Sequence, residues 1–407
     1  MTSQEKLAPG SPLPAEFIPL IVPEIRGNEW QYIKECLDTN WVSSVGMYVE
    51  RFEQMTAERT GTRFAIATVN GTSAIHIALL LAGVERNDEV IVSTLTFIAP
   101  ANAIRYVGAY PIFLDAEPRY LQINPDSLAE FIAKDCTWNG TDLRNRRSGR
   151  RVKAILPVHI LGHPVDLDPI LAIAAKYLLP VIEDATEGLG ATYRGKSLGS
   201  FGQTGCFSFN GNKIITTGGG GMLVTNDADL AARARYLTTQ AKDDPIEYVH
   251  NEIGYNYRLT NVLAAMGCAQ MEQLSSFIEA KRSIAQRYRE ALRDLPGFTL
   301  PEEAPWASST FWMYTVLIDE QAAGVGSRDL LRELGRRKIQ CRPLWQPMHH
   351  SAAHDPSGSP PCPVADRIHA QALSLPCSVG LTPLAQDHVI HSIASILADA
   401  NAVSRAR

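Results

Sequence analysis

The feature that most constrains the fold is a regular alternation of short apolar segments with helical segments across residues 64–225. The apolar segments are rich in β-branched residues and show no polar face, which is typical of strands buried on both sides. Such strands form mostly parallel sheets that are flanked by helices. The sequence therefore predicts an α/β fold. The predicted strands are 64–69, 89–93, 111–115, 154–159, 180–184 and 206–209.

The remainder of the chain predicts a second, smaller domain. A long helical pattern covers 260–295 and ends at a Pro-Gly pair, which stops helices. We expect a polar, arginine-rich surface loop at 136–151 and a last helix at 383–402. The expected domains are a flexible N-terminus (1–18), a large domain with an N-terminal arm (19–270) and a small C-terminal α+β domain (271–407).

Charge and cysteine content narrow the class of protein. The net charge of −5 is mild, so we expect neither a nucleic-acid partner nor a basic membrane-binding face. No apolar run is long enough for a membrane span. The seven cysteines are odd in number and include no C-x-x-C motif, which favours free thiols in a reducing cytoplasm.

Two side chains of opposite charge follow predicted strands at the same edge of the sheet. Asp184 ends the buried run VIED, and Lys213 follows the run FSFNGN. Ligands of open α/β sheets bind at the carboxyl ends of the strands. Pyridoxal phosphate requires a lysine that holds its aldehyde covalently and a carboxylate that keeps its pyridine nitrogen protonated. Taken singly, a lysine after a strand is usually a solvated surface residue, and an aspartate there usually caps a helix or forms a turn.

A third element of such a site is a cradle for the phosphate. The stretch ATVNGTSAIHIALLLAG predicts a strand, a short turn and a helix. Amide groups at a helix N-terminus attract anions, so Gly71, Thr72 and Ser73 are the expected phosphate ligands. Ordinary helix capping explains the same residues equally well. The order of cradle, acid and lysine along one sheet is what favours the cofactor site.

The chain from about residue 19 onward resembles the DegT/DnrJ/EryC1/StrS family of sugar aminotransferases, which have fold type I. The resemblance is carried by NGTSAIHIALLLAGV, EVIVSTLTFIAPANAI, VIEDATEGLGATYRGKSLGSFG, GCFSFNGNKIITTGGGGMLVTND and GYNYRLTNVLAAMGCAQMEQL. It implies that Lys213 holds the cofactor, that Asp184 faces the pyridine nitrogen and that Phe97 stacks on the ring. It also implies that Ser208 joins Thr72 and Ser73 at the phosphate.

The resemblance further implies a homodimer with shared active sites, in which Asn256 reaches the phosphate bound by the neighbouring subunit. One position departs from the family pattern. Members often carry Gln or His where this chain has Glu187, and an acidic residue there would lie near the phenolic oxygen of the cofactor. Surface exposure on a helix is the alternative explanation for Glu187, and plain core packing is the alternative for Phe97.

The expected reaction moves the amino group of L-glutamate onto a nucleotide-linked keto-deoxy sugar. RPLWQPMHH and the stretch that ends in GYNYRLTN resemble the subgroup that acts on carbon 4 of UDP-4-keto-6-deoxy-N-acetyl sugars of bacillosamine and legionaminic pathways. The alternatives are amination at carbon 3 and a GDP- or dTDP-linked substrate. A pyridoxamine-dependent sugar dehydratase, in which histidine replaces the lysine, and a non-catalytic regulator are further alternatives that Lys213 disfavours.

Two other motifs do not support a function. Residues 190–197, GATYRGKS, match the P-loop pattern, but the following LGSFGQTG breaks helices, so we expect a turn between short strands. His349, His350 and His354 lie near Cys341 and Cys362, but the cysteines lack the paired spacing of zinc sites. We therefore expect no metal, and these histidines or Trp345 are expected to line the substrate pocket instead.

Overall fold

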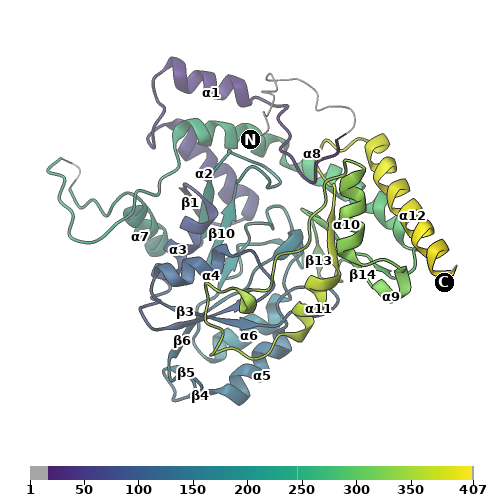
Figure 1. The fold of residues 1–407 in the computed structure, drawn as a ribbon. Helices are drawn as coiled ribbons and strands as arrows, with labels where there is room; N and C mark the ends of the chain where they lie inside the picture. Colours follow the sequence, from purple (N-terminus) through teal and green to yellow (C-terminus); the bar gives the residue numbers. More distant parts are fainter. Residues whose placement is uncertain (1–16, 245, 406–407) are drawn as a thin grey trace.

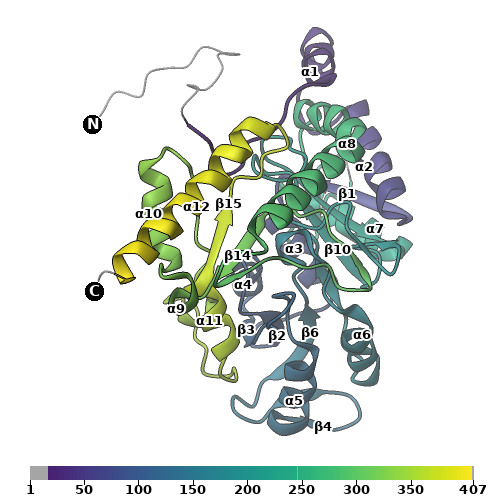
Figure 2. The ribbon, with the colours of Figure 1, turned by 90° about the vertical axis from the view of Figure 1, so that its right-hand side faces the viewer.

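The computed structural model of the chain describes residues 17–244 and 246–405. Of the flexible N-terminus that we expect at 1–18, residues 1–16 therefore lie outside the described part. A broad sheet with helices on both faces forms the larger part of the molecule (Figure 1), and a smaller group of helices and strands lies beside it (Figure 2). In the described residues, no helix is both long enough and apolar enough to cross a membrane.

The predicted α/β layer is confirmed. Its strands lie in the order β3, β2, β6, β7, β10, β11 and β1, where isolated parallel bridges join β6 to β7. Only β11 pairs antiparallel with its neighbours in this layer, so the sheet is mostly parallel. The strands are β1 (Phe64–Thr68), β2 (Glu89–Ser93), β3 (Tyr110–Leu114), β6 (Arg151–Leu156), β7 (Ile182–Asp184), β10 (Thr204–Ser208) and β11 (Gly221–Thr225).

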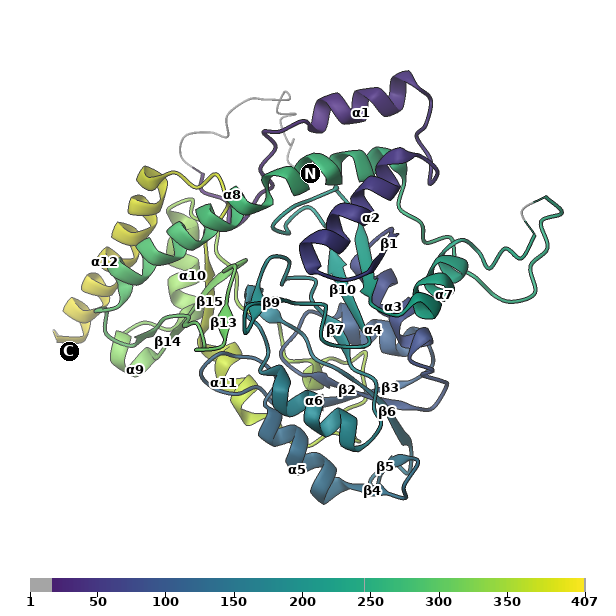
Figure 3. The same ribbon diagram turned by 180° about the vertical axis from the view of Figure 1, so that it is seen from behind.

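Helices cover both faces of the sheet. The chain first moves along the sheet from β1 to β2 and β3, and then moves back from β3 to β6 and β7. Because connections between parallel strands are right-handed, these two directions place their helices on opposite faces. The helices α3 and α4 connect β1 to β2 and β2 to β3 and pack together, whereas α5 and α6 pack together on the other face (Figure 3). The strands β2 and β11 are buried along their full length. Of these two, the sequence predicts β2 but not β11. The helices are α1 (Glu29–Asp38), α2 (Met47–Thr60), α3 (Gly71–Leu81), α4 (Ala99–Tyr106), α5 (Pro125–Asp135), α6 (Leu167–Lys176) and α7 (Ala228–Thr238).

The prediction of a loop at 136–151 is wrong. The segment forms a hairpin of β4 (Cys136–Trp138) and β5 (Leu143–Asn145), and β5 pairs with the start of β6. The turn contains Asn139 and Gly140, and Gly140 has a φ of 96°, which suits glycine. These strands are short and polar, so periodicity did not reveal them, although the Asn-Gly pair is a hairpin signal.

The long helix predicted at 260–295 is confirmed as α8 (Asn261–Leu292). It packs against α1 and α2 at one end and against α12 at the other, so it connects the two parts of the molecule (Figure 2). The smaller part contains an antiparallel sheet in the order β12, β14, β15. Its elements are β12 (Phe298–Thr299), β13 (Ala307–Ser308), β14 (Tyr314–Ile318), α9 (Glu320–Ala323), α10 (Ser327–Arg336), η2 (Met348–His350), α11 (Pro363–Gln371), β15 (Ala372–Leu375) and α12 (Pro383–Arg405).

The first described residues attach to the smaller part of the molecule. Ile18 forms a parallel bridge with Ile339, and the Cys377 amide donates to the carbonyl of Leu20. The expected boundary between residues 270 and 271 falls inside α8. The division into 1–18, 19–270 and 271–407 stays a prediction. All seven cysteines are buried and unpaired, as expected for free thiols.

Candidate active site

A cavity of about 330 Å³ lies at the carboxyl edge of the parallel strands. Its walls come from the ends of β7 and β10, the start of α3, the segment after β2 and two segments of the smaller part. Seven of the nine residues expected at the site line this cavity. They are Gly71, Thr72, Phe97, Asp184, Glu187, Ser208 and Lys213.

Asp184 is the last residue of β7, and only 2% of its surface is exposed. One carboxylate oxygen accepts a hydrogen bond from the Thr186 amide at 3.1 Å. Burial raises the pKa of Asp184, and the hydrogen bonds from Thr186 and the positive charge of Lys213 offset this rise only in part. A buried carboxylate whose charge is incompletely compensated favours a cationic partner in the cavity.

Lys213 lines the same cavity, and its side chain is mostly buried, with 13% of it exposed. Its Nζ lies 3.3 Å from Oε1 of Glu187 and 4.3 Å from the ring centre of Trp312. The other oxygen of Glu187 accepts a hydrogen bond from the Leu161 amide at 2.8 Å. Burial raises the pKa of Glu187, while Lys213 and this amide lower it by less. Glu187 is therefore not a surface residue.

The start of α3 lies where the phosphate cradle is expected. Asn70 caps the helix, and its side-chain oxygen accepts a hydrogen bond from the Ser73 amide at 2.8 Å. Ser73 does not line the cavity, and its amide is used by the cap. Gly71 and Thr72 line the cavity, and the first amides of a helix have no carbonyl partner within it. Both capping and anion binding are thus compatible with this turn.

The cradle is tight enough to require glycine. A Cβ atom at Gly71 would lie 2.9 Å from Cβ of Ser208 and 3.0 Å from Cγ2 of Thr186. A Cβ atom at Gly221 would lie 2.4 Å from the carbonyl group of Asn70. These close approaches bring β10 and β11 directly against the start of α3. Ser208, the last residue of β10, thereby faces the same space as the helix N-terminus.

Aromatic side chains form the walls of the cavity. Phe97 is 54% exposed and lies at the cavity, so it does not belong to the core. Trp345 also lines the cavity, as expected, whereas the expected pocket histidines are absent from its lining. Trp312, which sequence reasoning missed, lines the cavity from the smaller part of the molecule and donates a hydrogen bond to the Asn212 carbonyl at 2.8 Å. No local pattern marks Trp312, because the fold brings it to Lys213 from 99 positions away in the chain.

Asn256 is exposed and does not line the cavity of its own chain. It pairs with Thr239 at the base of a segment that extends away from the body of the molecule beside α7 (Figure 1). This position leaves Asn256 accessible to a second molecule, and its role at a neighbouring site stays a prediction. The segment 190–197 forms a hairpin of β8 (Thr192–Tyr193) and β9 (Lys196–Ser197), as expected in place of a P-loop.

The cavity fits pyridoxal phosphate. It combines an amine, a buried carboxylate and a helix N-terminus whose first residue leaves no room for a side chain. These are the groups that the aldehyde, the pyridine nitrogen and the phosphate of this cofactor require. The exposed ring of Phe97 offers an aromatic surface for the cofactor ring.

Comparison with known proteins identifies similar enzymes. Residues 23–394 match the DegT/DnrJ/EryC1/StrS aminotransferase family. The GDP-perosamine synthase of Caulobacter vibrioides is 40% identical over 381 residues, which cover 93% of this chain and 98% of that protein. A putative pyridoxal phosphate-dependent aminotransferase of Bacillus subtilis, EpsN, is 39% identical over 90% of this chain and 92% of its own length. The structure of DesI in the presence of its TDP-sugar product has a TM-score of 0.82 and 28% identity, covering 97% of both chains.

Proposed function

Because this chain belongs to the DegT/DnrJ/EryC1/StrS aminotransferase family and is a pyridoxal-phosphate-dependent sugar aminotransferase, we propose that it aminates carbon 4 of a GDP-linked 4-keto-6-deoxy sugar. The single observation that carries the chemistry is the meeting of Lys213 and Asp184 in one cavity. The proposed amino donor is L-glutamate, as the family resemblance implies.

The proposed roles follow from the positions of the side chains. When bound, pyridoxal phosphate stabilises the negative charge that remains on a substrate carbon after a proton has left. Lys213 would hold the cofactor, and its amine would move the proton from the α-carbon of the donor. Asp184 would keep the pyridine nitrogen of the cofactor protonated, and that positive charge would compensate the buried carboxylate. Gly71 and Thr72 at the start of α3 and Ser208 at the end of β10 are the proposed phosphate ligands. The expected role of Ser73 stays a prediction, because its amide is used by the cap.

Glu187 holds Lys213 in place in this proposal. Its carboxylate is fixed by the Leu161 amide and lies 3.3 Å from Nζ, so the amine has a counter-charge whenever it is protonated. The family resemblance implies that the same carboxylate would lie near the phenolic oxygen of the cofactor. Phe97 and Trp312 add aromatic surface to the wall of the cavity.

The GDP-linked substrate is supported by the relatives and replaces the UDP-linked N-acetyl sugar expected from sequence. The curated relative from Caulobacter vibrioides that is 40% identical is a GDP-perosamine synthase, and so is a relative from Escherichia coli O157:H7 that is 37% identical. Both similarities extend over more than nine tenths of this chain, so they include the loops outside the central sheet.

A homodimer with shared sites is supported by two exposed apolar surfaces. Large side chains of the segment that contains α1 are exposed, among them Trp30 (74%) and Val45 (64%). The projecting segment beside α7 exposes Ile246 and Ile253, both at 82% (Figure 1). Exposed apolar surfaces of this kind mark interfaces, and Asn256 lies at the base of the segment that carries the second one. The expected cytoplasmic location stays a prediction.

The test is a product assay with purified protein, L-glutamate and a panel of GDP-, UDP- and dTDP-linked 4-keto and 3-keto sugars. Mass spectrometry and NMR should identify an amino group on carbon 4 of the GDP-linked sugar and an equal amount of 2-oxoglutarate. A UDP-linked product would return the assignment to the substrate expected from sequence. A dehydrated sugar without nitrogen would contradict the transferase itself.

A further inference from the structure

The connecting segment, residues 342–362, joins the smaller part of the molecule to the edge of the central sheet. It begins at Arg342, which pairs with Ser374, and its Trp345 lines the active-site cavity. At its other end, Ser359 Oγ accepts a hydrogen bond from the amide of Phe113 on the edge strand β3. Between these ends lies η2 (Met348–His350), which carries two adjacent histidines.

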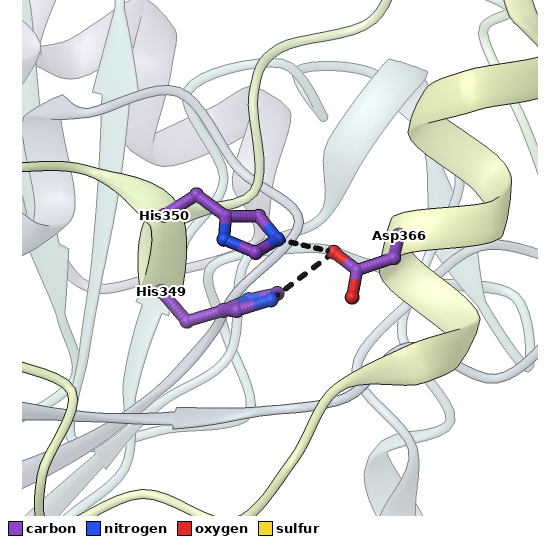
Figure 4. A group of neighbouring side chains, drawn as sticks. All are labelled: His349, His350 and Asp366. Atoms are coloured by element: carbon purple, nitrogen blue, oxygen red, sulfur yellow. Dashed lines mark hydrogen bonds and ion pairs between the residues drawn. The ribbon is translucent and has the colours of Figure 1, made fainter.

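Three side chains with metal-binding atoms converge beside η2 (Figure 4). In the part of the chain that the structure describes, the ligand atoms of His349, His350 and Asp366 all lie within 4.8 Å of one another. Nε2 of His349 lies 3.1 Å from Oδ1 of Asp366, and Nε2 of His350 lies 2.7 Å from the same oxygen. Two imidazoles from one short element and a carboxylate from α11 thus point at one position.

The orientation of His349 is fixed by a partner on its other nitrogen. Nδ1 of His349 lies 2.7 Å from Oγ1 of Thr94, which directly follows β2. The backbone holds the same arrangement, since the Met348 amide donates to the Thr94 carbonyl at 2.8 Å. An Nδ1–H that bonds to this hydroxyl leaves the lone pair of Nε2 free toward Asp366. Metal-binding histidines are usually oriented by such a hydrogen bond.

The carboxylate is held equally firmly. Asp366 lies in the first turn of α11, and Asp115 anchors that helix by accepting hydrogen bonds from the amides of Val364 (3.0 Å) and Ala365 (2.8 Å). The positive end of a helix dipole disfavours a cation. The dipole is equivalent to about half a positive charge at the helix N-terminus. The two carboxylates at this end, Asp115 and Asp366, carry more negative charge than is needed to offset it.

We propose that His349, His350 and Asp366 form a binding site for one zinc ion. Zinc prefers nitrogen and carboxylate ligands in a tetrahedral arrangement, and bond lengths near 2.0–2.1 Å place neighbouring ligand atoms about 3.3 Å apart. The 3.1 Å separation already matches this geometry. The 2.7 Å separation must widen, which His350 and Asp366 allow because their side chains are 51% and 44% exposed. Water completes the fourth position.

The ion joins the connecting segment to α11 and lies outside the catalytic cavity. Its ligand His349 bonds to Thr94, which lies in the same segment as the cavity residues Thr96 and Phe97. The two histidines also tie η2 to α11, and η2 lies in the same segment as Trp345. The expectation of no zinc from the sequence rests on the short helical stretch around the histidines and on the spacing of Cys341 and Cys362, and these cysteines are not part of this cluster. The third ligand is the carboxylate of Asp366 in α11. Nothing in the spacing of residues along the sequence indicates that it lies beside the two histidines.

The experiment is a zinc titration of the tag-free, cofactor-loaded protein by calorimetry, after dialysis against a chelator. One ion per chain should bind the unmodified protein. His350→Ala and Asp366→Asn should each weaken binding by about tenfold or more, because even the loss of an outer partner costs 10–100-fold. The exposed His388 on α12 supplies the matched control, and His388→Ala should leave zinc binding unchanged.

The visible band of the bound cofactor and the melting temperature without zinc report whether each variant is folded. His350 lies in η2 and Asp366 lies in α11, and both side chains are exposed. Each variant therefore removes one ligand of the proposed site independently of the other. Absence of zinc binding by the unmodified protein would overturn the proposal. Equal affinity of the unmodified protein and both variants would overturn it as well, since the ion would then be bound elsewhere.

Discussion

Gly71→Ala tests whether the start of α3 is a cradle for the cofactor phosphate. On its own, alanine at a helical position stabilises a helix relative to glycine by up to about 1 kcal/mol. Here the new Cβ would lie 2.9 Å from Cβ of Ser208 and 3.0 Å from Cγ2 of Thr186. Carbon atoms pack best at about 3.5–4.0 Å, so the helix start must move away from β10 by roughly 0.5–1 Å.

The expected effect is weaker binding of the cofactor by a folded protein. Inserting a methyl group into such a packed site costs about 1–3 kcal/mol. The unliganded chain relieves this strain by moving the cradle, but the bound phosphate needs the original position. At 1.4 kcal/mol for each factor of ten, the affinity for pyridoxal phosphate should fall about 5- to 150-fold.

The assay is an absorbance titration of the protein without cofactor, with far-ultraviolet circular dichroism as the check of folding. Gly211→Ala is the matched control, because a Cβ there meets nothing within 4 Å although Asn210 and Asn212 beside it line the same cavity. If Gly71→Ala binds the cofactor as tightly as Gly211→Ala, the phosphate is held elsewhere and the reasoning fails.

Three further changes test the charges and the framework of the site. Burial raises the pKa of Asp184, so cofactor-free Asp184→Asn should melt no lower than the parent at pH 7. The variant should also lose the rise in melting temperature that the cofactor gives to the parent. A retained rise would contradict the role of Asp184 as a partner of the cofactor. Burial also raises the pKa of Glu187 above its value in the unfolded chain, so the parent binds more protons when it is folded. The parent should therefore lose stability relative to Glu187→Gln as the pH rises through the acidic range. Urea unfolding at a series of pH values measures this difference, and the opposite slope would refute it. Asp115→Ala removes the acceptor for two amides at the start of α11 and should lower the free energy of unfolding by about 1–2 kcal/mol in urea, and an unchanged value would rule out the anchor.

The central sheet could be predicted from sequence because its strands are buried on both faces. The centres of such strands, for example 90–92, must be apolar, and their alternation with helices leaves few other folds. The hairpin at 136–151 could not be found in this way, since its strands are short, polar and stabilised by pairing with β6. Its register depends on a neighbour along the sheet, and local periodicity does not contain that information.

The site residues that lie at the first or last position of a helix or strand could be predicted from the sequence. Asp184 and Ser208 are the last residues of β7 and β10, and Gly71 is the first residue of α3, so topology alone brings them to one edge. Trp312 comes from the smaller part of the molecule and depends on how that part packs on the sheet. The partnership of the His349–His350 pair with Asp366 likewise depends on packing between elements.

The most direct test of the account is to locate the covalent attachment of the cofactor. Borohydride treatment of the yellow protein makes the linkage permanent, and mass spectrometry of the peptides then identifies the modified residue. The account predicts a single reduced pyridoxyl group on Lys213, the amine that shares its cavity with Asp184 and Glu187, and none in Lys213→Ala. A pyridoxyl group on another lysine, or full turnover by Lys213→Ala, would contradict it.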